Sequence, residues 1–200
     1  MIYLFVTAYL LGAFSPAHLI TRWRTGQNIR DLGSRNAGAT NVAREVGFHW
    51  GVLVLLLDVA KGVLAIVLAR AFFGGDIWTL ASASFGVVIG HNWPLTLRFR
   101  GGRGVAAYVG VWLAILPLLT VTALALSGAV LLLTRRPVLM VATGVLAFNA
   151  LVLITGQALE SVSLCLALSA FLVATHLFTV RQRIFSAVRE RRWLDILDLE

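Results

Sequence analysis

The stretch GVLVLLLDVAKGVLAIVLARAFF, residues 51–73, is apolar almost from end to end and is long enough to cross a lipid bilayer as one helix. The chain of 200 residues shares this character, with 59% hydrophobic residues, 13% charged residues and a mean hydropathy of +0.87. A soluble domain of ordinary composition has about 25% charged residues. The composition therefore predicts an all-α, polytopic integral membrane protein.

Similar apolar stretches predict further transmembrane helices on both sides of this one. The clear stretches are 1–21, 77–97, 138–156 and 158–180, whereas 105–134 can be read as one long helix or as two short ones. We expect residues 1–21 to be a retained first helix and not a signal peptide. The reason is that no basic residue precedes the apolar core and no small-residue cleavage pattern ends it.

The arginines decide between the two readings of 105–134. Sixteen of the seventeen basic residues are arginine, and all of these except Arg70 cluster between the apolar stretches, in 22–44, 98–103, 135–136 and 181–192. Because cytoplasmic loops are enriched in basic residues, all four clusters are expected on one side of the membrane. This requires two crossings in 105–134, broken near Pro117. We therefore expect seven transmembrane helices, with the N-terminus outside and the C-terminus cytoplasmic.

A polar loop, GSRNAGATNVAREVG at residues 33–47, interrupts the apolar pattern. Hydroxyl, amide and guanidinium groups are closely spaced in it, and its glycines free the backbone to approach a ligand. Such a loop suits a phosphate group, and ATNVAREVG can continue as a helix whose N-terminus attracts an anion. The alternative is an ordinary solvated loop with a capping Thr or Asn. The polar residues concerned are Ser34, Asn36, Thr40, Asn41 and Arg44.

The second polar stretch is GHNWPLTLRFRGGRGVAA, residues 90–107. It places a glycine-flanked cation, Arg103, near the expected start of a helix, where an anion again fits. Considered alone, His91 is equally consistent with a hydrogen-bonded histidine inside a helix, and Trp93 with an aromatic residue at the membrane interface.

The third stretch is the C-terminal THLFTVRQRIFSAVRERRWLDILDLE, residues 175–200. His176 closes the last apolar stretch, and Arg181 and Arg183 follow at the interface. Apolar residues recur at helical spacing further on, and lipid headgroup contact is the simpler reading for most of these arginines. We expect one membrane-embedded domain over 1–200, in which 181–200 forms a basic amphipathic cytoplasmic tail.

Asp58 and Lys61 lie one helical turn apart within an apolar stretch. They can neutralise each other as a structural salt bridge, or they can serve function, since ionisable groups inside a membrane are expensive. The single cysteine, Cys165, allows no internal disulfide and no thiolate metal site, so we expect it to contribute to packing.

Four motifs together resemble a known family. In their order and spacing they are similar to the PlsY family of bacterial membrane acyltransferases, which acylate glycerol 3-phosphate with acyl phosphate. The resemblance is close over about residues 10–107 and looser in the last apolar stretch. The motifs are YLLGAFSPAHLI (9–20), DLGSRNAGATNVAREVG (31–47), LLLDVAKG (55–62) and GHNWPLTLRFRGGRGVA (90–106).

The resemblance implies roles for individual residues. Its implied catalytic residues are Ser34, Arg44, Arg103 and His176. Its implied substrate-binding residues are Asn36, Gly38, Thr40, Asn41, Lys61, His91, Gly101, Gly102, Gly104, Thr179, Arg181 and Arg183.

Four residues depart from the family pattern. Arg35 stands where the family usually has Gly, Arg103 replaces a Lys, and Thr179 stands where Asn is usual, with Gln182 at the usual Arg position. Arginine keeps the attraction for phosphate but replaces a compact ammonium with a bulky planar group. Altered donor preference, rate or activity is therefore expected.

The resemblance implies synthesis of lysophosphatidic acid at the cytoplasmic face of the bacterial inner membrane. No nucleophile motif is visible, so direct transfer from acyl phosphate to glycerol 3-phosphate is expected, with His176, His91 or a phosphate oxygen accepting the proton. Membrane lipids are the expected surroundings, and we expect no cofactor, no metal and no nucleic acid. The alternatives are a transporter or channel for phosphate-bearing solutes, or a catalytically altered relative of the acyltransferases.

Overall fold

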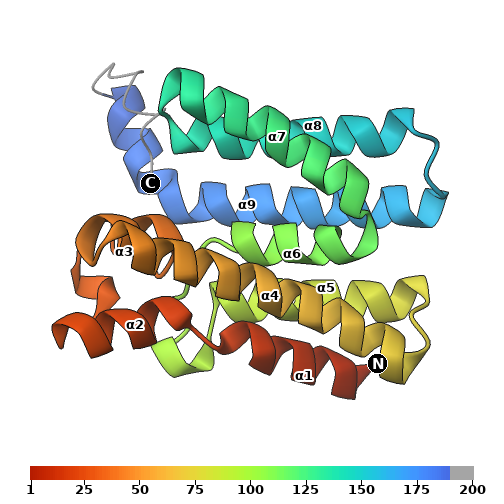
Figure 1. Cartoon of the computed structure of the whole chain (residues 1–200), viewed down its shortest axis with the longest axis horizontal. Helices are drawn as coiled ribbons and strands as arrows, with labels where there is room; N and C mark the ends of the chain where they lie inside the picture. Colours follow the sequence, from red (N-terminus) through yellow and green to blue (C-terminus); the bar gives the residue numbers. More distant parts are fainter. Residues whose placement is uncertain (190–200) are drawn as a thin grey trace. The chain divides into compact units, whose positions relative to one another are not determined.

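The computed structural model describes the backbone of residues 1–189 and the side chains through Thr179. This part of the chain contains α-helices and short 3₁₀ turns but no strand (Figure 1). The long helices coincide with the apolar stretches of the sequence, and the short ones lie in or beside the polar loops. The α-helices are α1 (Ile2–Ala13), α2 (Pro16–Thr25), α3 (Ala39–Glu45), α4 (Phe48–Phe73), α5 (Ile77–Asn92), α6 (Val105–Ile115), α7 (Pro117–Thr134), α8 (Pro137–Ile154) and α9 (Leu159–Arg189). Two 3₁₀ turns are η1 (Ile29–Asp31) and η2 (Leu95–Leu97). The all-α class is confirmed.

The chain forms two compact units that divide between α6 and α7. The first unit, Met1–Ile115, contains the first and second polar stretches. The second unit begins at Leu116 and contains α7, α8 and α9. The expected tail at 181–200 lies outside the described side chains.

The first apolar stretch is not the single helix that we expected. It breaks at Phe14 and Ser15 into α1 and α2, because Pro16 has no N–H to donate and disfavours helical geometry in the residue before it. Ser15 caps the second piece by accepting a hydrogen bond from the His18 backbone N–H at 3.4 Å. The break leaves backbone carbonyls at the end of α1 without helical N–H partners, and Lys61 donates hydrogen bonds to two of them.

A second break confirms the reading of 105–134 as two short helices. The chain leaves the helix at Leu116, directly before Pro117, so that α6 and α7 are separate. The expected helix at 77–97 also ends early, at Asn92, because Pro94 follows.

Five helical segments of the described residues are long and apolar enough to cross a membrane, the first of them being α1 and α2 taken together. The helix α6, with 11 residues, is shorter than a full crossing requires. The number of crossings and the orientation of the termini stay predictions.

Glycines allow the helices of the first unit to approach closely. In this unit α1 packs on α5, and α4 lies along α1 and α6 (Figure 1). A Cβ atom added to Gly62 of α4 would lie 2.9 Å from the backbone nitrogen of Val111 and 3.0 Å from the Cα of Gly110, both in α6. Close backbone contact of this kind is the usual mode of helix association in membranes, where the hydrophobic effect does not drive it.

The second unit uses polar contacts between its helices. Asn149 of α8 donates to the Ser169 hydroxyl of α9 at 2.9 Å and accepts from the Cys165 thiol at 3.4 Å. Cys165 is 1% exposed, which agrees with the packing role expected for it.

Candidate functional site

The first polar loop is organised by one buried side chain, Asn41. Its amide nitrogen donates to the backbone carbonyls of Leu32 at 3.1 Å and Asn36 at 3.0 Å, with a longer contact of 3.4 Å to Ile29. Its amide oxygen accepts from the Ser34 backbone N–H at 3.1 Å. Because both ends of the amide hold loop backbone, Asn41 shapes the loop that carries Ser34.

Two residues of this loop adopt left-handed backbone geometry. Gly33 has φ 48° and Arg35 has φ 60°. Glycine tolerates this region at no steric cost, whereas a residue with a Cβ is strained there. The geometry at Arg35 therefore gives a physical reason for the glycine that the family usually has at this position, whereas nothing in the structure explains the arginine.

The second polar loop folds back onto the end of α5. The N–H groups of Gly101 and Gly102 donate to the carbonyls of Asn92 at 2.9 Å and His91 at 3.1 Å. A Cβ added to Gly102 would collide with the His91 imidazole ring. The two glycines thus permit the close contact that sets the position of the following Arg103.

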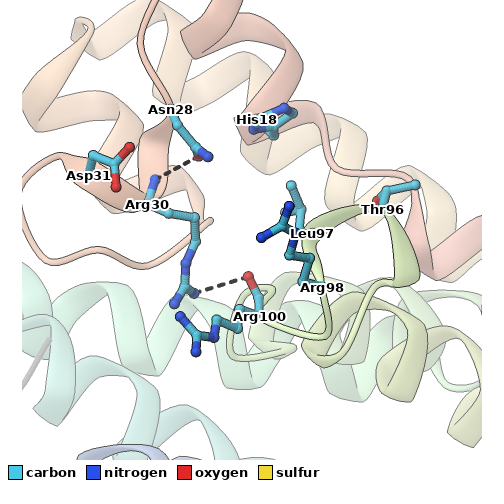
Figure 2. A pocket seen from close by; sticks show the side chains of 8 residues that line it. All are labelled: His18, Asn28, Arg30, Asp31, Thr96, Leu97, Arg98 and Arg100. Carbon is cyan, nitrogen blue, oxygen red and sulfur yellow. Dashed lines mark hydrogen bonds between the residues drawn. The ribbon is translucent and has the colours of Figure 1, made fainter.

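The Arg30 side chain connects the segment before the first loop to the second loop. Arg30, in the η1 turn just before the first loop, donates through Nη1 to the carbonyl of Arg100 at 3.0 Å, with a longer contact of 3.4 Å to Gly101 (Figure 2). Its own backbone N–H donates to the Asn28 side chain at 3.0 Å. The loops carrying Ser34 and Arg103 are therefore held together, although about seventy residues separate them in the sequence.

Below the loops, a buried polar network links α4 to α1 and α5. Lys61 lies 2.7 Å from Asp58 and donates to the carbonyls of Gly12 at 2.9 Å and Phe14 at 3.1 Å, at the break after α1. The same Asp58 oxygen lies 3.4 Å from Nδ1 of His91. The salt bridge between Asp58 and Lys61, one of the two roles considered for this pair, is present. Lys61 also caps the end of α1 through its hydrogen bonds to the two carbonyls.

The predicted site residues of the first unit fall into two groups. Asn41, Lys61 and His91 are buried, being 2%, 4% and 7% exposed, and their described contacts are with other parts of the protein. The remaining residues lie on the two joined loops or on α3, at least partly accessible except for Gly101 and Gly104: Ser34, Asn36, Gly38, Thr40, Arg44, Gly101, Gly102, Arg103 and Gly104. The substrate contacts of both groups stay predictions.

The third motif belongs to the second unit. His176 is partly buried on α9, and the Thr179 hydroxyl donates to the Thr175 carbonyl at 2.8 Å. The side chains of Arg181 and Arg183 lie outside the described residues. The approach of this motif to the two loops therefore stays a prediction.

The contact of Arg30 with the second loop was not predicted from the sequence. Arg30 was counted only as a member of an arginine cluster, because the signal available, an arginine in the sequence NIRD just before the loop, does not say which distant carbonyl it will meet.

Comparison with known proteins agrees with this architecture. The family described as glycerol-3-phosphate acyltransferase matches residues 2–186. A glycerol-3-phosphate acyltransferase of Thermoanaerobacter sp. (strain X514) is 41% identical over 143 residues, which are 72% of this chain and 71% of the relative. One of Halalkalibacterium halodurans is 45% identical over 121 residues, covering 60% of this chain and 59% of the relative.

Solved structures are similar over almost the whole chain. The crystal structure of PlsY, an integral membrane glycerol 3-phosphate acyltransferase, in its glycerol 3-phosphate form has a TM-score of 0.83 and 29% identity, with 92% of each chain covered. Its lysophosphatidic acid form has a TM-score of 0.81 and 28% identity over the same share of both chains. These matches favour an acyltransferase over the transporter or channel considered as an alternative. The chain is a multi-pass integral membrane protein and belongs to the PlsY family of glycerol-3-phosphate acyltransferases.

Proposed function

We propose that the protein transfers an acyl chain from acyl phosphate to the 1-hydroxyl of glycerol 3-phosphate, giving lysophosphatidic acid. The observation that carries this proposal is the joining of the two glycine-containing loops through Arg30, which holds the loops of Ser34 and Arg103 together in one site. Related structures in glycerol 3-phosphate and lysophosphatidic acid forms support this substrate and this product.

The transfer needs no covalent enzyme intermediate. The hydroxyl oxygen attacks the acyl carbonyl carbon and forms the ester bond, the bond from that carbon to the phosphate oxygen breaks, and inorganic phosphate leaves. Since phosphate is a good leaving group, the protein mainly brings two anionic groups together and orients the hydroxyl. We assign phosphate binding to Ser34, Arg44 and Arg103, assisted by the glycine backbone N–H groups of the loops.

The hydroxyl proton needs an acceptor. We assign this role to His176 or to a phosphate oxygen of either substrate. His91 is the weaker candidate, because it is 7% exposed and its Nδ1 lies against Asp58. Because Asn41, Lys61 and His91 are all buried against other parts of the protein, we assign them to positioning: Asn41 holds the first loop, His91 supports the second, and Lys61 holds the end of α1. We assign Thr179, Arg181 and Arg183 to substrate binding.

We further propose that the site faces the cytoplasm of a bacterial inner membrane. The basic residues of both loops support this orientation, since arginine is enriched in cytoplasmic segments. The same rule supports seven crossings, with the N-terminus outside and the basic tail at 181–200 in the cytoplasm. We propose that these crossings form a single functional domain.

The test is transfer of labelled glycerol 3-phosphate into lipid by the purified protein in monoolein or detergent. Acyl phosphate and acyl-CoA are supplied in separate reactions. Product from acyl phosphate alone, lost in a Ser34→Ala, Arg44→Ala variant and kept in Arg22→Gln, is the expected result. Arg22 is the matched control because it is an exposed arginine of the same unit outside the proposed site. Absence of product with both donors, despite binding of glycerol 3-phosphate, would refute the proposed reaction.

A further inference from the structure

A second basic feature lies beside the two joined loops. A cavity of about 590 Å³ opens between α2, the loop that contains η1 and the loop that contains η2 (Figure 2). A smaller cavity of about 420 Å³ shares part of this lining and adds Arg35. The lining of neither cavity includes Ser34, Arg44 or Arg103. The residues around the larger cavity are His18, Asn28, Arg30, Asp31, Thr96, Leu97, Arg98 and Arg100.

The charge of this lining is strongly unbalanced. Arg30, Arg98 and Arg100 face one carboxylate, Asp31, and among the described side chains no ion pair joins any of these arginines to an acid. Burial lowers the pKa of Arg30, and the neighbouring Arg100 lowers it further. Guanidinium groups held together in this way repel each other unless an anion lies between them.

The backbone holds these arginines at a cost. Arg98 and the following Phe99 both have left-handed geometry, with φ 52° and 59°, and Arg35 of the smaller cavity has φ 60°. Left-handed backbone at residues other than glycine is uncommon and concentrates where a ligand contact or a switch requires it. At Arg98 this geometry orients a side chain that makes no hydrogen bond or ion pair with another described residue.

A histidine with an unsatisfied nitrogen atom belongs to the same lining. Nδ1 of His18, in the wall of the larger cavity, is buried and has no hydrogen-bond partner among the described residues. Buried polar atoms of native proteins are almost always paired, so an unpaired one calls for a missing partner. An imidazole nitrogen that carries a proton can donate to the same anion as the guanidinium groups.

The helix α2, which supplies His18 to the cavity, also carries residues typical of the membrane surface. Trp23, near the end of α2, is 70% exposed, and its ring lies 5.4 Å from that of Trp50 at the start of α4. The Arg24 guanidinium lies over both rings, at 5.4 Å and 5.0 Å from their centres. Tryptophan and arginine gather where a membrane protein meets lipid headgroups, so we expect headgroups beside this end of α2.

We propose that the cavity between the η1 and η2 loops binds a phosphate monoester carried by a membrane lipid, at a site separate from that of glycerol 3-phosphate. Three guanidinium groups match a dianionic monoester better than the single charge of a phosphodiester. A volume of about 590 Å³ accommodates a phosphate with its glycerol. The inference does not rest on the proposed function: the two share only Arg30, which joins the loops, while the assigned phosphate-binding residues Ser34, Arg44 and Arg103 lie outside the cavity lining and the inference involves no chemical step.

The experiment measures lipid binding to the intact protein by native mass spectrometry in detergent. Dioleoyl phosphatidate is the monoester probe, dioleoyl phosphatidylglycerol the diester probe, and inorganic phosphate the competitor. We expect phosphatidate to bind more tightly than phosphatidylglycerol, and Arg98→Gln to weaken phosphatidate binding by about tenfold, the loss expected for one charge-assisted contact. Arg98→Lys should recover part of the affinity because it restores the charge.

Two variants make the test specific. Arg22→Gln removes one charge from the same unit outside the cavity and should change the affinity by less than about twofold. Arg44→Ala, which alters the proposed catalytic site, should leave phosphatidate binding intact. If inorganic phosphate at the same concentration as phosphatidate displaces the lipid, free phosphate is a ligand of the same site. If it does not, the lipid-borne phosphate is the ligand that the cavity prefers.

Unchanged binding in Arg98→Gln, or an equal loss in Arg98→Gln and Arg44→Ala, would overturn the inference. Absence of acyl transfer by the unaltered protein, with its phosphatidate binding retained, would count against the proposed function alone.

Discussion

The ammonium group of Lys61 lies 2.7 Å from the Asp58 carboxylate in the middle of α4, and both side chains are at least 96% buried. The same ammonium holds the carbonyls of Gly12 and Phe14, where the first apolar stretch breaks. One buried cation therefore neutralises an acid and caps a helix end, and His91 connects the acid to the loop of Arg103.

Replacing Lys61 should consequently destabilise the first unit. We expect Lys61→Met to lower the free energy of unfolding in detergent by about 3 kcal/mol, because it leaves Asp58 charged and buried and the carbonyls of α1 uncapped. Asp58→Asn should lower the free energy of unfolding less when it is added to Lys61→Met than when it is made in the unaltered protein, because the two groups interact. Denaturant unfolding of the single and double variants measures this coupling, and additive effects would contradict it.

The contact of α4 with α6 should depend on the absence of a side chain at Gly62. We expect Gly62→Ala to lower the free energy of unfolding by about 2 kcal/mol, since the added Cβ meets the backbone of Ala107 and Val111. Gly128→Ala in α7 is the matched control, because a Cβ there meets no described atom within 4 Å. The control should be neutral or slightly stabilising through helix propensity. Equal melting temperatures for the two variants would refute the close approach.

The left-handed geometry of Arg35 predicts a stabilising substitution. Arg35→Gly should raise the free energy of unfolding by about 0.5–1 kcal/mol, because relief of the strain at φ 60° exceeds the added entropy of the unfolded chain. Arg22→Gly, within α2, should lower it by a similar amount. Thermal unfolding of both variants provides the comparison. A loss of stability in Arg35→Gly would show that contacts of the Arg35 side chain contribute more to stability than its backbone strain costs.

Asn41 should be required for the shape of the first loop. Asn41→Ala removes the donors to Leu32 and Asn36 and the acceptor for the Ser34 N–H, at about 1 kcal/mol for each hydrogen bond lost. We expect trypsin to cleave this variant faster at Arg30 and Arg35, and acyl transfer to fall at least about tenfold because Ser34 is displaced.

Gln27→Ala is the control for the Asn41 substitution, because it changes an exposed side chain in the segment that precedes the first loop. It should leave both cleavage and transfer unchanged. Normal transfer in Asn41→Ala would instead mean that the loop keeps its shape through other contacts.

Local signals predicted much of the helix pattern but misplaced two helix ends. Pro117 was read correctly as a break, because its missing N–H interrupts the helix wherever the rest of the chain lies. Pro16 and Pro94 carry the same signal but lay inside or beside strongly apolar stretches, and hydropathy averaged over a stretch does not register one missing hydrogen bond. The first helix was therefore predicted too long, and so was the helix that ends at Asn92.

The candidate site was predicted as a set of residues but not as an arrangement. Asn41 was expected to bind substrate because its amide suits phosphate, yet the same amide satisfies the backbone of its own loop equally well. Sequence alone does not choose between these partners, since the choice depends on which groups the folded loop brings within about 3 Å.

The sequence by itself determined the membrane class, the all-α fold and the motifs of the PlsY family, because apolar length and residue order are properties of the chain alone. Only the tertiary structure decided that Arg30 meets the Arg100 carbonyl, that Lys61 caps the end of α1 and that the basic cavity forms beside them. Each of these depends on contacts between segments about fifty to seventy residues apart, which the packing of α1, α4 and α5 creates and no local pattern encodes.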